Sequence, residues 1–204
     1  MQIFKTSKIL TISAIVLSTT ILSACFGGSS EPSRYYTIAA ESIQMPQAAT
    51  SSARLQVRKF TIDPAYKRSN IVYRESPYDF MFYDLDLWAT RPEQMMTQVA
   101  SEYFIKSNLF KAVDLKPVVK PEYELIGHID AIEEVDEGSA QFAHVAMQLT
   151  FRQVDGEAPL WEKRYDDKMS MDKREPRFAA EAASKLVGKF MEDAIKEIGE
   201  SIAK

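Results

Sequence analysis

The sequence predicts a single domain of the α+β class, in which two helices pack on one face of a mostly antiparallel sheet. Apolar and polar residues alternate over three consecutive segments, 123–132, 143–154 and 160–169. Apolar residues recur at helical spacing in two others, 95–104 and 176–202. A chain of 204 residues is of ordinary single-domain size.

The three alternating segments predict an antiparallel meander with one solvated face. The second segment alternates most regularly, with apolar residues at Ala143, Val145, Met147, Leu149 and Phe151. Asp155-Gly156 then forms a hairpin signal before the third segment. The connection before the second, from Glu133 to Ser139, is acidic and contains Gly138. We therefore expect a solvated hairpin loop there.

Shorter strands are expected at 35–38, 54–62, 71–74, 78–88 and 110–115. Within 54–62 the apolar positions change parity after Val57, and a β-bulge near Arg58 or Lys59 would restore one face. The first helix is predicted to open at Arg91-Pro92-Glu93, because proline and an acidic residue favour the first turn. The second, from about Pro176 to Ile202, carries an apolar stripe at Ala183, Val187, Phe190, Ala194, Ile198 and Ile202.

The first 24 residues are expected to form a secretory signal peptide. Lys5 and Lys8 precede an uncharged, largely apolar run over 9–22, and small residues follow it. The sequence Leu22-Ser23-Ala24-Cys25 resembles the bacterial lipobox, which implies that Cys25 is acylated and becomes the first residue of the mature chain. The alternative is an ordinary secretory signal with an incidental cysteine. Residues 25–34 would then be the lipidated cysteine and a flexible tether.

The predicted anchor determines how the chain would meet a membrane. Each buried CH₂ contributes ~0.8 kcal/mol, so several acyl chains hold a protein stably. Phe26, rather than an aspartate, follows Cys25, and by analogy with enterobacterial sorting this indicates the periplasmic face of the outer membrane. The 25 Lys and Arg are outnumbered by 29 Asp and Glu. This balance argues against a nucleic-acid partner and against a polybasic contact with anionic lipid.

Residues that could carry chemistry are few. The sequence contains no HExxH, Walker A, GxGxxG or nucleophile-elbow motif. His128 and His144, its only histidines, lie on predicted neighbouring strands outside the core face, and two histidines with an acid could bind a metal. The simpler interpretation is two solvent-facing residues. We therefore expect no metal site, no cofactor and no enzymatic activity.

The region from 66 to 88 is unusually aromatic. Its strand over 78–88 is apolar on both faces. Such a strand is either buried on both sides or presents one face to a partner or to lipid. Both interpretations stay open, and the candidates for a partner or lipid interface are Tyr66, Tyr73, Phe80, Phe82 and Trp88.

Four short motifs follow the lipobox in order: Tyr35-Tyr36-Thr37-Ile38, Pro64-Ala65-Tyr66, Ile71-Val72-Tyr73-Arg74 and Leu87-Trp88-Ala89. Together they resemble the ABC-type transport auxiliary lipoproteins, a family that includes the lipoprotein of the paraquat-inducible operon. Many relatives have an apolar residue before Pro64 and leucine after Tyr66. This chain has Asp63 and Lys67 there, which places the shape of the turn in question.

The resemblance implies that residues 35–204 form an ABC-type transport auxiliary lipoprotein domain. Such a protein would be a non-enzymatic component of a lipid-transport system, with a mammalian-cell-entry (MCE) domain protein and an ABC permease as partners. A homo-oligomer is compatible with this role. The main rival is an outer-membrane assembly factor or an activator of a cell-wall synthase. A periplasmic lipid carrier would need an enclosed apolar cavity, and a lipoprotein enzyme lacks its motifs.

Overall fold

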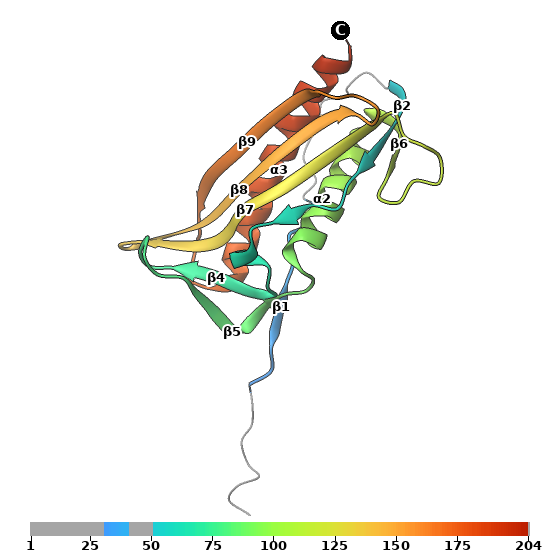
Figure 1. Ribbon diagram of the computed structural model, residues 1–204. Coiled ribbons are helices and arrows are strands. Elements are labelled where there is room, and N and C mark those ends of the chain that lie inside the picture. Colours follow the sequence, from blue (N-terminus) through green and yellow to red (C-terminus); the bar gives the residue numbers. More distant parts are fainter. Residues whose placement is uncertain (1–30, 41–50, 204) are drawn as a thin grey trace, which may run out of the picture. The chain divides into compact units, whose positions relative to one another are not determined.

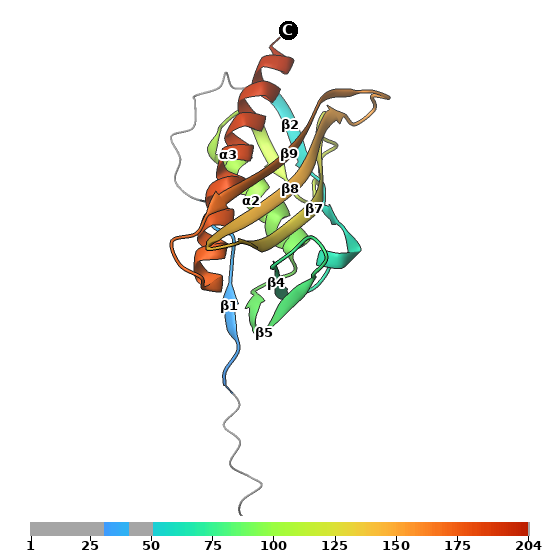
Figure 2. The ribbon, with the colours of Figure 1, turned by 90° about the vertical axis from the view of Figure 1, so that its left-hand side faces the viewer.

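The computed structural model describes residues 31–40 and 51–203. The predicted signal peptide and Cys25 lie outside these residues. From Ser33 onward the chain forms one unit, in which two helices cover one face of a curled sheet (Figures 1 and 2). Neither helix in the described ranges combines the length and the apolar character needed to cross a membrane.

The predicted meander is confirmed. Strand β7 (Tyr123–Glu137) pairs antiparallel with β8 (Ala140–Gln153), and β8 pairs antiparallel with β9 (Pro159–Ser170). The alternation in β8 buries the apolar residues against the helices and leaves polar residues on the opposite, helix-free face. We call this side of the sheet the outer face.

The other edge of β7 pairs with three short strands in succession. These are β2 (Ser51–Val57), β3 (Thr61–Ile62) and β4 (Asn70–Arg74), and all three run parallel to β7. The predicted irregularity near Arg58 and Lys59 falls in the break between β2 and β3. One interrupted segment therefore follows a single neighbour along most of its length.

The sheet is mixed, whereas the sequence predicted a mostly antiparallel one. Strand β5 (Met81–Trp88) pairs antiparallel with β4, but β1 (Arg34–Tyr36) runs parallel to β5, and β6 (Phe110–Asp114) runs parallel to β2. The order along the sheet is β1-β5-β4-β7-β2-β6. Alternation shows that a segment is a strand but not which way its neighbour runs, because register and direction depend on distant partners.

The two helices begin where the sequence predicted. Helix α2 (Pro92–Lys106) and helix α3 (Pro176–Ile202) each start at a proline. The predicted stripe of α3 is buried from Ala183 to Ile198, and Ile202 is half-buried. The α+β class with helices on one face is confirmed.

The end of β7 differs from the sequence prediction in a way that shapes the site. The pairing with β8 shifts between Ile129 and Ala131, so that Glu133 lies opposite His144 on the outer face and Glu134 faces the helices. The expected solvated loop over 133–139 is therefore wrong. The strand continues to Glu137, and the chain turns at Gly138, whose φ of 67° suits glycine.

Candidate docking site

Three aromatic side chains are exposed on the hairpin formed by β4 and β5. Tyr78, Phe80 and Phe82 are 95%, 38% and 45% exposed. The guanidinium carbon of Arg68 lies 4.6 Å from the ring centroid of Phe82 and 5.9 Å from that of Phe80. These four residues are called the aromatic surface. Aromatic residues and arginine are the types that carry most binding energy in protein interfaces.

The tip of this hairpin is held in one shape by Arg74. Its Nη2 donates to the carbonyl oxygen of Pro77 (2.6 Å) and its Nε to that of Asp79 (3.0 Å). The Ser76 hydroxyl donates to the Asp79 carboxylate (2.6 Å), and the Asp79 amide donates to the Ser76 carbonyl oxygen (3.3 Å). The tip therefore presents Tyr78 on a hydrogen-bonded frame.

Tyr66 supports the aromatic surface from behind. It ends the 3₁₀ turn η2 (Pro64–Tyr66), which Asp63 caps by accepting a hydrogen bond from the Ala65 amide at 2.8 Å. Asp63, which stands where many relatives have an apolar residue, thus caps the turn. The Tyr66 ring meets Phe80 edge-on, with centroids 5.3 Å apart, and its hydroxyl donates to Glu133 Oε2 at 2.6 Å. Tyr66 therefore connects the hairpin to β7.

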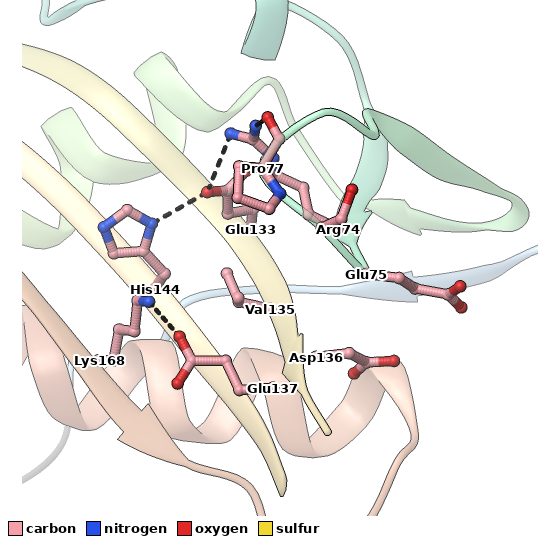
Figure 3. A pocket seen from close by; sticks show the side chains of 10 residues that line it. Arg74, Glu75, Pro77, Glu133, Val135, Asp136, Glu137, His144 and Lys168 are labelled. Atoms are coloured by element: carbon pink, nitrogen blue, oxygen red, sulfur yellow. Dashed lines mark hydrogen bonds and ion pairs between the residues drawn. The ribbon is translucent and has the colours of Figure 1, made fainter. Parts of the chain in front are cut away.

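Glu133 is a buried carboxylate with several partners. Its side chain is 3% exposed, and its Oε1 lies 3.0 Å from His144 Nδ1 and 3.9 Å from Arg74 Nη1 (Figure 3). Burial and then the hydrogen bond to Glu133 raise the pKa of Tyr66, so its hydroxyl stays a donor at neutral pH. A buried carboxylate is tolerated only with such compensation.

An open pocket of about 430 Å³ lies beside Glu133, between the tip of the hairpin and the ends of β7, β8 and β9 (Figure 3). Its lining includes Arg74, Val135, His144 and Lys168. Lys168 Nζ is paired with Glu137 Oε1 at 2.5 Å. The acidic run that the sequence placed in solvent is thus folded into strand and pocket, because its members find partners on neighbouring strands.

The helix-facing side of the hairpin is also supported. The rings of Tyr73 and Tyr83 lie 4.7 Å apart, and the Tyr83 hydroxyl donates to Glu134 Oε2 at 3.1 Å. Glu134 is 1% exposed, and burial raises its pKa above the usual value. The hairpin is therefore supported on both faces.

The five predicted interface residues occupy different depths. Phe80 and Phe82 lie at the surface, and Tyr73 is half-buried. Tyr66 and Trp88 are 6% and 3% exposed. The structure therefore brings Tyr66 and Phe80 together, with the buried Tyr66 ring supporting the exposed Phe80 ring. Trp88 instead lies in the core, at the opposite end of β5. Cys25 lies outside the described residues.

The two histidines do not face each other. His128 lies opposite Gln148 and its Nδ1 is 2.7 Å from the Thr61 hydroxyl, whereas His144 lies opposite Glu133. Within residues 31–40 and 51–203, no group of three or more His, Cys, Asp and Glu side chains is arranged to hold a metal ion.

A second exposed apolar region was missed by the sequence analysis. The connection from β6 to β7 exposes Leu115, Val118 and Val119 by 39%, 101% and 57%. Residues 115–120 are called the aliphatic loop. A usable signal was present, because Val118-Val119 is bracketed by two Lys-Pro pairs, which predicts an exposed turn and not a core segment. The roles of Arg68 and Arg74 were also missed: Arg74 was noted only as part of a family motif, and no pattern marks an arginine by its contacts.

The family model that matches this chain describes a class of transport-associated lipoproteins. The chain belongs to the family of ABC-type transport auxiliary lipoprotein components, whose model matches residues 36–194. The match spans the aromatic surface, the meander and most of α3. A search of curated proteins found no match.

Solved structures share this fold at low sequence identity. A protein from Xanthomonas campestris is 15% identical with a TM-score of 0.75, covering 83% of this chain and 96% of its own. An uncharacterized protein is 12% identical with a TM-score of 0.65, covering 82% and 99%. A hypothetical protein from Chlamydia trachomatis is 6% identical with a TM-score of 0.50, covering 74% and 98%. At these identities the similarity establishes the fold alone.

Proposed function

We propose that this protein is a non-enzymatic, lipid-anchored component of an ABC/MCE-type system that transports lipid across the envelope. We propose further that its aromatic surface docks on the MCE-domain partner. The observation that carries the docking role is the exposure of Tyr78, Phe80 and Phe82 beside Arg68 on a hydrogen-bonded hairpin. Phe80 and Phe82 are held by contacts with Tyr66 and Arg68, and side chains that are already ordered lose little conformational entropy on binding.

The chemistry of the neighbouring pocket supports docking over lipid storage. The pocket is lined by charged groups that are paired with each other, such as Lys168 with Glu137 and His144 with Glu133. An acyl chain gains nothing from such walls, because burying it there would desolvate charges without replacing their partners. We therefore interpret the paired charged residues around the pocket as a rigid support for the hairpin.

The position of β1 suits a tethered role. Strand β1 pairs with the last residues of β5, Arg34 with Asp86 and Tyr36 with Trp88, so the predicted tether would join the domain at the end of β5 away from the hairpin tip. The predicted tether of about nine residues, 26–34, would reach only ~15–18 Å on average. The proposed anchor in the outer membrane would thus hold the folded domain near the periplasmic face.

The anchor is tested by replacing Cys25. We expect Cys25→Ser to move the protein from the membrane fraction to the soluble periplasmic fraction, because the acyl chains are lost. The matched control is Ser23→Ala, which keeps a small residue in the lipobox and should leave the protein in membranes. Retention of the Cys25→Ser protein in membranes would contradict acylation.

The partner is tested by mild crosslinking in intact cells, purification of this protein, and mass spectrometry of what accompanies it. We expect an MCE-domain protein together with its permease. Recovery of a cell-wall synthase or an outer-membrane assembly protein, with no MCE component, would replace this proposal with the activator or assembly-factor role.

A further inference from the structure

His144 lies between two carboxylates from the strands on either side of it. Its Nδ1 is 3.0 Å from Glu133 Oε1, and its Nε2 is 2.9 Å from Asp166 Oδ1. A neutral imidazole has one N–H and one lone pair, so it can donate to only one of them. Both contacts are hydrogen bonds only when the ring is a positively charged imidazolium. The geometry therefore assigns His144 the charged form.

The surroundings of His144 contain charged and titratable groups from four elements: Glu133 and Glu137 on β7, Arg164, Asp166 and Lys168 on β9, Arg74 on β4, and Tyr66 in η2. Lys168 is engaged by Glu137, and Arg164 contacts Asp166 at 3.4 Å. The hydrogen bond to Glu133 raises the pKa of His144 most; burial opposes it, and the bond to Asp166 adds to it.

Arg74 connects this cluster to the hairpin. Its Nη1 lies 3.9 Å from Glu133 Oε1, while Nη2 and Nε donate to carbonyl oxygens of the hairpin tip. One guanidinium is thus shared between a buried carboxylate and the frame that presents the aromatic surface. A change in charge near Glu133 therefore changes the electrostatic attraction between Glu133 and Arg74.

We propose that His144 is a positioning residue for the aromatic surface. Its positive charge compensates the buried carboxylate of Glu133, so that Arg74 stays on the carbonyl oxygens of the hairpin tip. When His144 loses its proton, Arg74 is the one charged ion-pair partner left to Glu133 among the described residues, since Lys168 is paired with Glu137, and Arg74 is drawn inward. The hairpin then loosens as the pH rises. Only the consequence for partner binding rests on the proposed function.

The first test needs no partner. Hydrogen exchange of the Asp79 amide, which donates to the Ser76 carbonyl oxygen, reports whether the hairpin tip is closed. Let the pKa of His144 be higher when the hairpin tip is closed than when it is open. The protection factor of the Asp79 amide, corrected for intrinsic exchange, should then fall about tenfold for each unit of that difference. The fall should occur as the pH rises through that pKa, above the usual 6.5.

Three variants separate positioning from a general loss of structure. His144→Gln should remove the pH dependence and leave Asp79 weakly protected throughout. Asp166→Asn, at a half-exposed site, removes one partner of the imidazolium and should move the transition to lower pH while leaving full protection in acid. His128→Gln changes the other histidine and should behave as wild type. Constant protection in the wild type, or an unchanged transition in His144→Gln, would overturn the proposal.

A second measurement distinguishes failure of this inference from failure of the proposed function. As the pH rises, the affinity of the mature chain for the purified MCE-domain partner should fall in parallel with the protection of the Asp79 amide. In the His144→Gln variant, this affinity should not change with pH. A pH-dependent hairpin without partner binding at any pH would refute docking and leave the role of His144 intact. Strong binding with constant protection would refute the role of His144 and leave docking intact.

Discussion

The aromatic surface and the aliphatic loop both expose apolar side chains, yet they are built differently. They lie toward opposite ends of β7: β4 pairs with it at Glu133–Val135, whereas β2, the neighbour of β6, pairs at Tyr123–Leu125. The ten or so residues between these registers correspond to roughly 33 Å along the strand. The two exposed apolar regions are therefore well separated on the molecule.

The difference lies in what supports the exposed side chains. Behind the aromatic surface, Tyr66 packs on Phe80 and Arg74 fixes the hairpin tip. In the aliphatic loop, the ion pair of Lys120 with Asp155 joins two side chains that are 67% and 77% exposed. Ordered aromatic residues and arginine make binding hot spots, whereas valine and leucine are under-represented there. Exposure alone therefore does not identify a docking site.

The largest expected effect distinguishes the two regions directly. The double variant Phe80→Ser, Phe82→Ser should weaken binding to the proposed MCE-domain partner by about 100-fold or more, because hot-spot residues contribute about 2 kcal/mol or more each. The matched variant Val118→Ser, Val119→Ser should change the affinity less than about threefold. Calorimetric titration measures both, with thermal unfolding as the control for folding. The reverse order of effects would assign docking to the aliphatic loop.

The next effect concerns support of the aromatic surface. Tyr66→Phe removes the hydroxyl that donates to buried Glu133 and should lower the free energy of unfolding by about 1–3 kcal/mol. Tyr78→Phe removes the hydroxyl of a 95% exposed residue and should change it by less than about 0.5 kcal/mol. Urea denaturation compares them. Equal losses would show that the contact between Tyr66 and Glu133 does not stabilise the hairpin.

A smaller effect of opposite sign is expected on the helix-facing side. Burial raises the pKa of Glu134, so its ionised form destabilises the folded protein, and this penalty grows as the pH rises through the raised pKa. Glu134→Gln should therefore raise the free energy of unfolding at neutral pH, by about 1 kcal/mol. The gain should disappear as the pH falls toward about 4.3, where glutamic acid is also protonated in the unfolded chain. A gain independent of pH would contradict this cause.

The smallest effect is expected in the aliphatic loop. Lys120→Ala breaks the ion pair with Asp155 and should change the free energy of unfolding by less than about 0.5 kcal/mol, because exposed ion pairs contribute little. Urea denaturation at low and high salt measures it. A loss above about 1 kcal/mol would mean that the loop is held more firmly than its contacts indicate.

Local patterns predicted the meander and both helices, because alternation in β8 and the prolines that open α2 and α3 depend only on nearby residues. The parallel strands beside β7 could not be predicted in the same way, since direction is decided by distant pairing.

The site was predicted in part. Phe80 and Phe82 were marked by an excess of aromatic residues, but nothing in the pattern said which face is covered. The contact between Glu133 and His144 depends on the register shift after Ile129, which moves Glu133 to the outer face. This one-residue irregularity within β7 has no local sequence signature, so the acidic run was predicted to be solvated.

The most direct test of docking through the aromatic surface is site-specific photocrosslinking in intact cells. A photoreactive phenylalanine analogue replaces either Tyr78 or Val118, both of which are fully or almost fully exposed. We expect the probe at position 78 to capture the MCE-domain protein and the probe at position 118 not to capture it. Capture of that protein only from position 118, or capture of only a cell-wall synthase or assembly protein from position 78, would contradict it.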